Sequence, residues 1–314
     1  MTKSKVVIIG TGFVGMSYAY ALLNQGTIEE LVLIDLNKDK AEGEAMDLNH
    51  GLAFAPRKMS IKAGDYSDCK DAGLVVITAG VNQKPGETRI DLLNRNAKII
   101  QNVTKNIMLS GFDGIILVAS NPVDVLTYVA WKESGLPTSK VLGSGTSLDT
   151  ARLRYEISKY IHIDSRNIHA YILGEHGDSE FVCWSKAYVG AKPMMDVIES
   201  MEQIEFKDLD LIYHKVRDAA QEIIKRKNAT YYGVGMALVR ITSAIFNNEN
   251  RIMPISVYND GVYDIEKDLY IGLPAVLNRD GVHHVVNLKL SNEEQEKLKS
   301  SSELLKKSLE QMDI

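Results

Sequence analysis

The segment Gly174–Asp178 places a histidine, His176, between two glycines, with Glu175 before it and Asp178 after it. Histidine is the side chain best suited to proton transfer near neutral pH, and the glycines allow a sharp turn that leaves its ring uncrowded. A single histidine in a turn more often has no catalytic role than a catalytic one. This one gains weight from three stretches upstream: a glycine-rich loop, a polar segment with an arginine, and a segment with both an aspartate and an arginine.

The last of these, Leu148–Arg154, carries Asp149 and Arg152. The segment is predicted to open a helix, and a spacing of three residues places both side chains on one face of it. Asp149 also suits the N-cap of that helix, so a purely structural role for it stays open. A strand predicted over Asn167–Leu173 would deliver His176.

The stretch Gly10–Gly15 has the pattern GxGxxG and lies between a buried apolar strand, Lys5–Gly10, and a helical run. The next strand, Glu30–Asp35, ends in an acid about 20 residues past the last glycine, and this context makes the motif credible. Backbone N–H groups at the helix N-terminus can bind a pyrophosphate. Asp35 can accept hydrogen bonds from both ribose hydroxyls and would repel a 2′-phosphate. The stretch therefore favours NAD over NADP, with a glycine turn that binds no ligand as the alternative.

Further buried strands alternate with helices along the first half of the chain. Strands are predicted at 74–79, 114–119 and 141–144, and a helix at 124–134, which indicates an α/β fold with a doubly wound parallel sheet. Ligands of such sheets bind at the carboxyl ends of the strands. The pattern therefore places Gly80, Ser120, Asn121 and Ser144 around one crevice.

The segment Val81–Ile90 is polar and lies between a strand and a helix predicted over 88–109. A connection of this kind at the carboxyl end of a sheet is a candidate lid, and it carries Arg89. An ordinary surface loop with a solvated arginine is the alternative.

From about residue 145 the alternation of strands and helices decays. Helices are predicted at 206–227, 230–246 and 291–311, and antiparallel strands at 252–258, 268–273 and 284–288. We therefore expect two domains, a dinucleotide-binding Rossmann domain over residues 1–145 and an α+β substrate domain over residues 146–314.

Composition limits the classes of function. The 314 residues are 45% hydrophobic and 25% charged, which is typical of globular proteins. A net charge of −5 without a long basic run argues against nucleic acid or an anionic membrane as a partner. Cys69 and Cys183 have no spacing that suggests a metal site or a redox pair, and no apolar stretch approaches the roughly 18 residues of a membrane span. We expect a cytoplasmic protein, since the N-terminus also lacks the features of a signal peptide.

Together these stretches resemble the L-lactate/L-malate dehydrogenase family over essentially the whole chain. The resemblance rests on six stretches in the family's order and near its spacing, namely Gly10–Gly15, Gln83–Arg89, Ala119–Pro122, Leu148–Arg152, Gly174–Asp178 and Ala229–Tyr232. Within the family the chain is most similar to the bacterial L-lactate dehydrogenases. The resemblance implies a cytoplasmic homotetramer. It also implies that the enzyme interconverts pyruvate and L-lactate with NAD in fermentative glycolysis.

The resemblance also implies a role for each candidate side chain. His176 would donate a proton to the keto oxygen, Asp149 would hold the imidazole in one tautomer and stabilise its charged form, and Arg152 would bind the substrate carboxylate through a bidentate pair. Arg89 would close over the substrate and stabilise charge on its carbonyl oxygen. The substrate site would be completed by Gln83, Asn121 and Thr230.

The cofactor site and an effector site are implied in the same way. The cofactor residues would be Gly10, Gly12, Val14, Gly15, Asp35, Lys40, Tyr66, Gly80, Val81, Ala119, Ser120, Asn121 and Ser144. Arg154 and His169 fall where bacterial members bind fructose 1,6-bisphosphate, and two copies of each about a twofold axis would face the bisphosphate with cationic groups. The resemblance implies no metal site.

Departures from the family pattern concern the range of substrates. Ser179–Trp184 differs from the Thr-Glu-Leu-Pro-Val-Trp run of typical bacterial members and is closer to the L-2-hydroxyisocaproate dehydrogenases, and Asn228 replaces a usual glycine. Gln83 stands where malate dehydrogenases carry an arginine, which disfavours oxaloacetate because its second carboxylate would be buried unpaired. A 2-oxoisocaproate reductase stays open as an alternative, as does a non-catalytic NAD-binding protein of the same fold.

Overall fold

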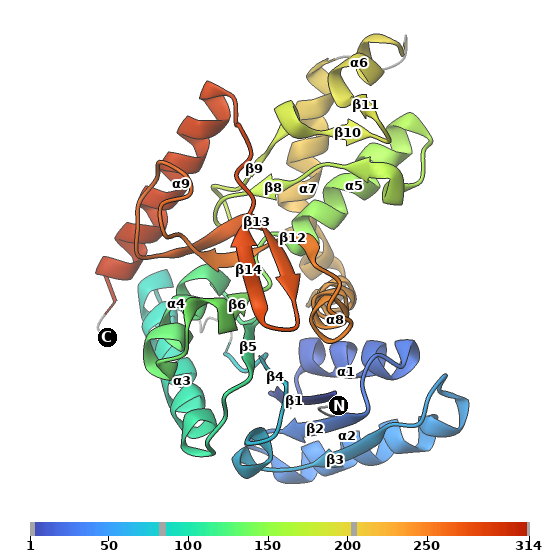
Figure 1. Ribbon diagram of the computed structural model, residues 1–314, viewed down its shortest axis with the longest axis vertical. Coiled ribbons are helices and arrows are strands. Elements are labelled where there is room, and N and C mark those ends of the chain that lie inside the picture. The colour runs from blue at the N-terminus through green and yellow to red at the C-terminus, as the bar shows by residue number, and fades with distance from the viewer. Residues whose placement is uncertain (1–3, 82–85, 202–205, 313–314) are drawn as a thin grey trace.

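A nine-stranded sheet runs through the computed structural model, which describes residues 4–81, 86–201 and 206–312 (Figure 1). The strand order is β14-β13-β12-β6-β5-β4-β1-β2-β3. Its parallel part consists of β1 (Lys5–Ile9), β2 (Glu30–Ile34), β3 (Ser60–Ala63), β4 (Leu74–Ile77), β5 (Ile115–Val118) and β6 (Val141–Gly143). The predicted doubly wound sheet is confirmed, and the order of strands reverses between β1 and β4, where such sheets bind ligands.

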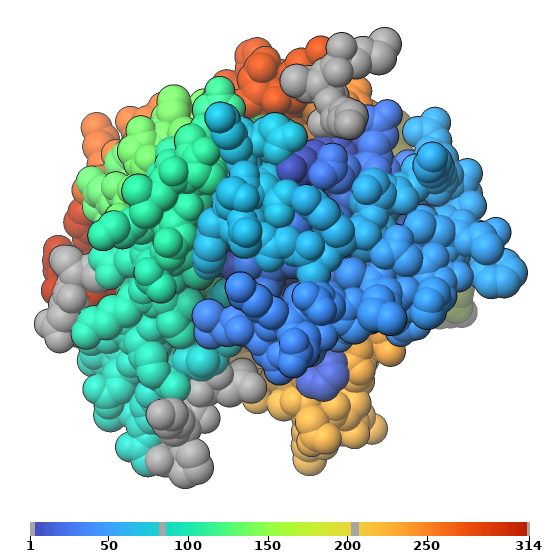
Figure 2. Space-filling view, turned by 90° about the horizontal axis from the view of Figure 1, so that it is seen from below, coloured from blue at the N-terminus to red at the C-terminus, as the bar shows by residue number. Residues whose placement is uncertain are grey.

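Helices cover the parallel strands and connect them. They are α1 (Phe13–Gln25), α2 (Lys38–Gly51), α3 (Arg89–Leu109) and α4 (Val123–Ser134). Residues of β1, β4 and β5 are buried on both faces, which explains why these strands are continuously apolar instead of alternating. The sequence pattern did not single out α2 and β3. Seen from below Figure 1, most of the surface belongs to this N-terminal half (Figure 2).

The antiparallel strands extend the same sheet. They are β12 (Arg251–Tyr258), β13 (Tyr270–Asn278) and β14 (Gly281–Val285), and β12 pairs with β6. The predicted antiparallel strands are confirmed, although β13 and β14 are shifted along the chain from their predicted ranges. Because the sheet continues across residue 145, the division into two domains there stays a prediction.

A second layer of structure lies above the sheet in Figure 1. It contains α5 (Ser147–Ile161), α6 (Met194–Glu199), α7 (Phe206–Lys227) and two small sheets, formed by β7 (Ile168–His169), β10 (Tyr188–Val189) and β11 (Lys192–Pro193), and by β8 (Ile172–Leu173) and β9 (Phe181–Val182). The single strand predicted over 167–173 is therefore wrong, because its two halves pair with different partners. Leu153, Ile157, Ile212 and Val216 form a separate core between α5 and α7.

The two remaining helices join these layers. Helix α8 (Tyr232–Phe246) packs against α1, and the C-terminal α9 (Asn292–Glu310) lies along the outside of β9 and α4 (Figure 1). Ser291 caps α9 and shares a capping box with Glu294. Among the described residues, the helices are all too short or too polar to cross a membrane.

Candidate active site

The glycine loop connects β1 to α1, and its glycines differ in what they are needed for. Gly10 has a φ of 105°, and a Cβ on Gly15 would lie 2.1 Å from the carbonyl oxygen of Gly10. Both positions therefore require glycine for the protein's own backbone. A Cβ on Gly12, the N-cap of α1, would meet no atom within 4 Å. Gly12 thus leaves open space at a helix N-terminus, where a phosphate group binds well.

Asp35 follows β2 and holds this loop in place. Its Oδ2 accepts hydrogen bonds from the backbone N–H and the hydroxyl of Thr11, at 2.7 and 2.9 Å, and its Oδ1 accepts one from the N–H of Asn37. Burial alone would raise the pKa of Asp35, but these bonds and the nearby Lys40 lower it. Lys40 also donates from Nζ to the carbonyl oxygen of Thr11 at 2.6 Å. The two predicted cofactor residues Asp35 and Lys40 therefore also stabilise the loop.

Most of the other predicted cofactor residues lie just after the carboxyl ends of neighbouring strands. Gly80 and Val81 follow β4, Ala119, Ser120 and Asn121 follow β5, Ser144 follows β6, Tyr66 follows β3, and Val14 lies in the first turn of α1. Asn96, a buried residue of α3, ties two of these segments together. Its side chain accepts from the N–H of Val81 at 3.0 Å and donates to the carbonyl oxygen of Asn121 at 3.4 Å. No sequence signal pointed to Asn96, since it is one polar residue among many on that helix.

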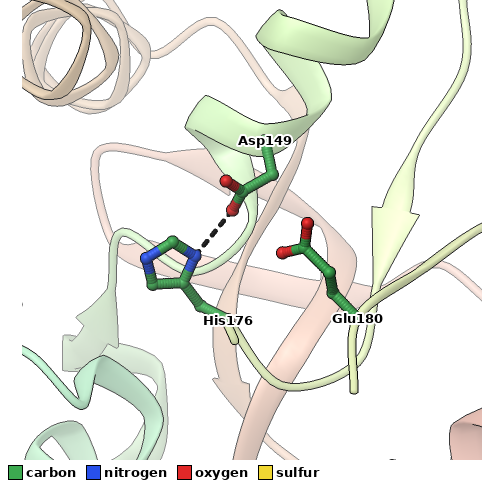
Figure 3. A group of neighbouring side chains, drawn as sticks. All are labelled: Asp149, His176 and Glu180. Carbon is green, nitrogen blue, oxygen red and sulfur yellow. Dashed lines mark hydrogen bonds and ion pairs between the residues drawn. The ribbon is translucent and has the colours of Figure 1, made fainter. Parts of the chain in front are cut away.

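His176 lies in the loop between β8 and β9 and faces Asp149 (Figure 3). Its Nδ1 is 2.6 Å from Oδ2 of Asp149, and its second ring nitrogen points away from both neighbouring carboxyl groups. Burial alone would lower the pKa of His176, but the charge and hydrogen bond of Asp149 raise it to about 9. Near neutral pH the ring is therefore an imidazolium that donates from Nδ1 to Asp149 and has a second proton to give at Nε2.

Asp149 lies in the first turn of α5, whose N-cap is Thr146. The structural alternative for Asp149, an N-cap, is therefore wrong, because the helix begins two residues earlier. The carboxylate instead binds His176 through Oδ2 and Nη1 of Arg152 through Oδ1, the latter at 2.9 Å. The side chain of Asp149 is only 3% exposed. Burial alone would raise its pKa, but His176 and Arg152 lower it, so it stays ionised.

Asp124 is a further buried carboxyl group of the site. From the first turn of α4 it accepts the backbone N–H of His176 at 2.8 Å and the hydroxyl of Ser256 in β12 at 2.5 Å. Burial raises the pKa of Asp124 to about 6, although these hydrogen bonds oppose the shift. Asp124 therefore holds the histidine loop against both α4 and the sheet. An acid two residues after Pro122, where a strand gives way to a helix, was the one sequence signal for it.

Glu180 is the third acid beside the histidine, and the sequence did not single it out either. It is 4% exposed, and its carboxyl group, that of Asp149 and a ring nitrogen of His176 all lie within 4.8 Å of one another (Figure 3). Burial and the neighbouring Asp149 raise the pKa of Glu180 to about 9. Three such groups have the spacing of metal ligands, but the guanidinium of Arg152 on Asp149 repels a cation. The cluster is therefore suited to hold protons.

For Arg89, Asn121 and Thr230, the other predicted substrate residues that the structure describes, no hydrogen bond or ion pair to Asp149 or His176 is found. Arg89, the first residue of α3, is 88% exposed and pairs at 3.5 Å with Asp178. Asn121 is exposed at the end of β5, and Thr230 is half-buried just before α8. Gln83 lies outside the described residues, so the lid predicted over 81–90 is described only in part.

The two predicted effector residues lie close together on the other side of α5. Arg154 donates from Nε to the carbonyl oxygen of Ala170 at 3.2 Å and lies 5.4 Å from the ring centre of Tyr171. Burial lowers the pKa of Arg154. His169, next to Ala170, is exposed on β7. A cavity of about 410 Å³ is lined by four arginines, namely Arg154, Arg166, Arg240 and Arg251.

Both halves of the chain match models of one family. Residues 4–143 match the lactate/malate dehydrogenase, NAD binding domain, and residues 146–313 match the lactate/malate dehydrogenase, alpha/beta C-terminal domain. The chain belongs to the lactate/malate dehydrogenase family. As the first family model describes, the cofactor of this fold is NAD, and the open space at Gly12 fits it.

Similar members of the lactate/malate dehydrogenase family are named as lactate dehydrogenases. L-lactate dehydrogenase 2 of Bacillus cereus (strain ZK / E33L) is 55% identical over 306 residues, which cover 98% of this chain and 97% of that protein. The crystal structure of MGS-M5, a lactate dehydrogenase from a Medee basin deep-sea metagenome library, is 76% identical with a TM-score of 0.99 over 100% of both chains. The ligand-bound minor L-lactate dehydrogenase of Enterococcus mundtii is 51% identical, with a TM-score of 0.96 over 99% of this chain and 98% of that one.

The two departures from the family pattern have structural explanations. Asn228 ends α7 with a φ of 68°, the left-handed conformation that a glycine would adopt there, and asparagine tolerates it better than other residues. Phe181 and Val182 are buried in β9, where they pair with Leu173 and Ile172. Phe181, Val182 and Asn228 therefore contribute to the packing and the backbone conformation of the protein.

Proposed function

We propose that this protein is an NAD-dependent L-lactate dehydrogenase, which reversibly reduces pyruvate with NADH and a proton to L-lactate. The observation that carries the proposal is the buried group in which Asp149 binds both His176 and Arg152. It presents a proton donor next to a guanidinium, and pyruvate has a keto oxygen next to a carboxylate. When bound, the nicotinamide supplies the hydride.

In this proposal His176 performs the acid–base step. The imidazolium donates its Nε2 proton to the keto oxygen as that oxygen gains charge, and in lactate oxidation the neutral ring takes the proton back. Asp149 stays ionised throughout, because His176 and Arg152 lower its pKa. The carboxylate holds the ring in one tautomer and stabilises its charged form. Because Nδ1 is bonded to Asp149, Nε2 is the nitrogen that would face the substrate.

Charge explains how the carboxylate of the substrate is held. Asp149 is negative, Arg152 and His176 are positive, and the raised pKa of Glu180 keeps that group neutral at pH 7. Arg152 and His176 are therefore the two positive groups that can bind an anion. The guanidinium has five N–H donors, so one nitrogen can bind Asp149 while others form a planar pair with the substrate carboxylate. Arg89 would reach the substrate only after movement, since it is exposed and paired with Asp178.

The test is the loss of NADH absorbance with pyruvate, oxaloacetate and 2-oxoisocaproate in turn. We expect the highest kcat/KM with pyruvate, because Gln83 offers no charge to pair with the second carboxylate of oxaloacetate. A preference for 2-oxoisocaproate would assign the protein to the alternative branch, and a preference for oxaloacetate would refute the argument from Gln83. If no 2-oxo acid were turned over, the alternative of a non-catalytic NAD-binding protein would be favoured.

We also propose the remaining features that the resemblance implies. These are a cytoplasmic homotetramer that acts in fermentative glycolysis, and a division of labour between residues 1–145 and 146–314. The buried free thiols of Cys69 and Cys183 fit a reducing compartment. We further propose that fructose 1,6-bisphosphate binds near Arg154 and His169, supported by the concentration of arginine side chains around the neighbouring cavity.

The effector proposal predicts a response that depends on pH. Fructose 1,6-bisphosphate should lower the apparent KM for pyruvate, and it should do so less at pH 7.5 than at pH 6, because the site includes a histidine, the residue type whose charge can change in this range. Arg154→Gln should abolish the response. The measurement is the KM for pyruvate with and without the bisphosphate at both pH values, and a KM that does not respond at either pH would remove this effector.

A further inference from the structure

Three acids follow or precede His176 closely in the chain, yet only Glu180 reaches the catalytic pair. Glu175 accepts a hydrogen bond from the hydroxyl of Ser179 at 2.6 Å, and Asp178 is exposed beside Arg89. Glu180 is buried, and its carboxyl group lies within 4.8 Å of both Asp149 and His176 (Figure 3). The mechanism proposed above requires only that Glu180 be uncharged, and it gives the carboxyl group no step and no contact with the substrate.

Two carboxyl groups this close together in a buried site do not ionise together at neutral pH. The first negative charge belongs on Asp149, because Arg152 and His176 are bonded to it. Among the described residues no cation pairs with Glu180, so Glu180 is the group that keeps a proton. Burial and the charge of Asp149 both raise its pKa, to about 9. A protonated Glu180 can donate a hydrogen bond to Asp149.

Glu180 also borders α7 and α9. A cavity of about 620 Å³ opens behind it between α7, α9 and β9, and Glu180 is among the residues that line it. Tyr213 of α7 donates from its hydroxyl to the backbone carbonyl of Glu180 at 2.5 Å. The charged groups that act on the carboxyl group of Glu180 are Asp149 and Arg152 of α5 and His176 of the loop. The titratable groups that line the same cavity are Asp178, Asp210, Tyr213, Glu293, Glu296 and Lys297.

We propose that Glu180 is a positioning residue that holds a proton against Asp149, and that loss of this proton in alkaline solution weakens the binding of the substrate carboxylate by Arg152. The inference rests on the proposed dehydrogenase function. While Glu180 is neutral, the cations Arg152 and His176 balance the carboxylates of Asp149 and Asp124, and ionisation of Glu180 would give the cluster a net negative charge. One added charge at about 12 Å with an effective dielectric constant of about 20 changes affinity about tenfold, and closer charges change it more.

Lactate oxidation separates Glu180 from His176, because the two groups then act in opposite directions. The histidine must be neutral to accept a proton, so its deprotonation favours turnover of lactate. Ionisation of Glu180 would instead place a negative charge beside Arg152 and raise the KM for L-lactate. Deprotonation of His176 also removes a positive charge near the substrate, so only the part of the alkaline rise in KM that Glu180→Gln abolishes reports Glu180.

The experiment measures the KM for L-lactate with saturating NAD⁺ from about pH 7 to about pH 10. We expect the KM of the wild-type enzyme to rise up to about tenfold per pH unit above the pKa of Glu180. Glu180→Gln should lose this rise, because an amide cannot ionise. Glu296→Gln is the matched control, since it removes a carboxylate from the same cavity without touching Asp149, and it should keep the rise.

An equal alkaline rise in all three proteins, or no rise in the wild type, would overturn the inference. Complete absence of lactate oxidation would instead count against the proposed function itself. If Glu180→Gln does not fold, the infrared carbonyl band of a protonated carboxylic acid in the wild-type protein decides the matter. We expect this band at about pH 8, where Asp124 with its pKa of about 6 is already ionised, and its loss by about pH 10. A protein without such a titrating band would contradict the proposal.

Discussion

The predicted nucleotide crevice and the acid–base cluster differ in the kinds of chemical group that form them. The crevice uses backbone groups, glycines and strand ends, and most of its residues come from short contiguous stretches such as Gly10–Gly15. The cluster uses charged side chains from distant segments, with Asp149 from α5, His176 and Glu180 from the loop around β9, and Asp124 from α4. The comparison teaches that the crevice depends on shape, whereas the cluster depends on which groups carry protons.

This difference sets what a mutation does in each region. In the crevice an added methyl group either collides with backbone or fills space that the cofactor would need. In the cluster a change of one atom alters the charge of a buried group whose neighbours were matched to it, and buried charges without partners are strongly unfavourable. We therefore expect larger effects on turnover from the cluster than from the crevice.

The largest effect should come from His176→Asn. The variant has no group that can donate a proton, and general acid catalysis typically contributes about 10²–10⁴-fold to the rate. We expect turnover of pyruvate to fall by that factor while NADH still binds, which fluorescence titration would measure. His50→Asn, at an exposed position near the end of α2, is the matched control. Near-normal turnover in His176→Asn would place the proton donor elsewhere.

Arg152→Lys should have a smaller effect, directed at substrate binding. Lysine keeps the charge but loses the planar pair of N–H donors, and a lost charge-assisted hydrogen bond is worth about 1.5–3 kcal/mol, or about tenfold to a hundredfold in affinity. We expect the KM for pyruvate to rise within that range, measured by steady-state kinetics at saturating NADH. Arg226→Lys, at an exposed arginine paired with Glu222, serves as the control. An unchanged KM in Arg152→Lys would remove Arg152 from the carboxylate site.

The smallest effect on turnover should come from the glycine loop, where two substitutions separate shape from binding. Gly12→Ala should leave the Tm of the cofactor-free protein unchanged and weaken NADH, because its Cβ enters space that no protein atom occupies. Gly15→Ala should lower the Tm, because its Cβ would lie 2.1 Å from the carbonyl oxygen of Gly10. Calorimetry measures the Tm of both variants, and titration measures their affinity for NADH. Equal losses of Tm in the two variants would contradict the different roles assigned to Gly12 and Gly15.

Much of the crevice could be predicted from the sequence because its signals are local. The apolar run Val6–Ile9, the glycine pattern and the acid at Asp35 occur within one βαβ unit, so their spacing alone indicates how they fold together. Helix α7 and the parallel strands β1 and β4 were predicted for the same reason, since periodicity and burial on both faces are written into neighbouring residues. Less regular segments escaped this reasoning, as β7 and β8 show, because their partners lie elsewhere in the chain.

By itself, then, the sequence determined the dinucleotide fold and the histidine with its aspartate and arginine, because those patterns are short and their residue types are specific. Only the tertiary structure decided that Asp149 binds His176 instead of capping α5, and that Asp124 and Glu180 join them. An acid in a sequence carries no sign of its burial. Whether it is ionised depends on groups brought beside it from other segments, and that information exists only once the chain has folded.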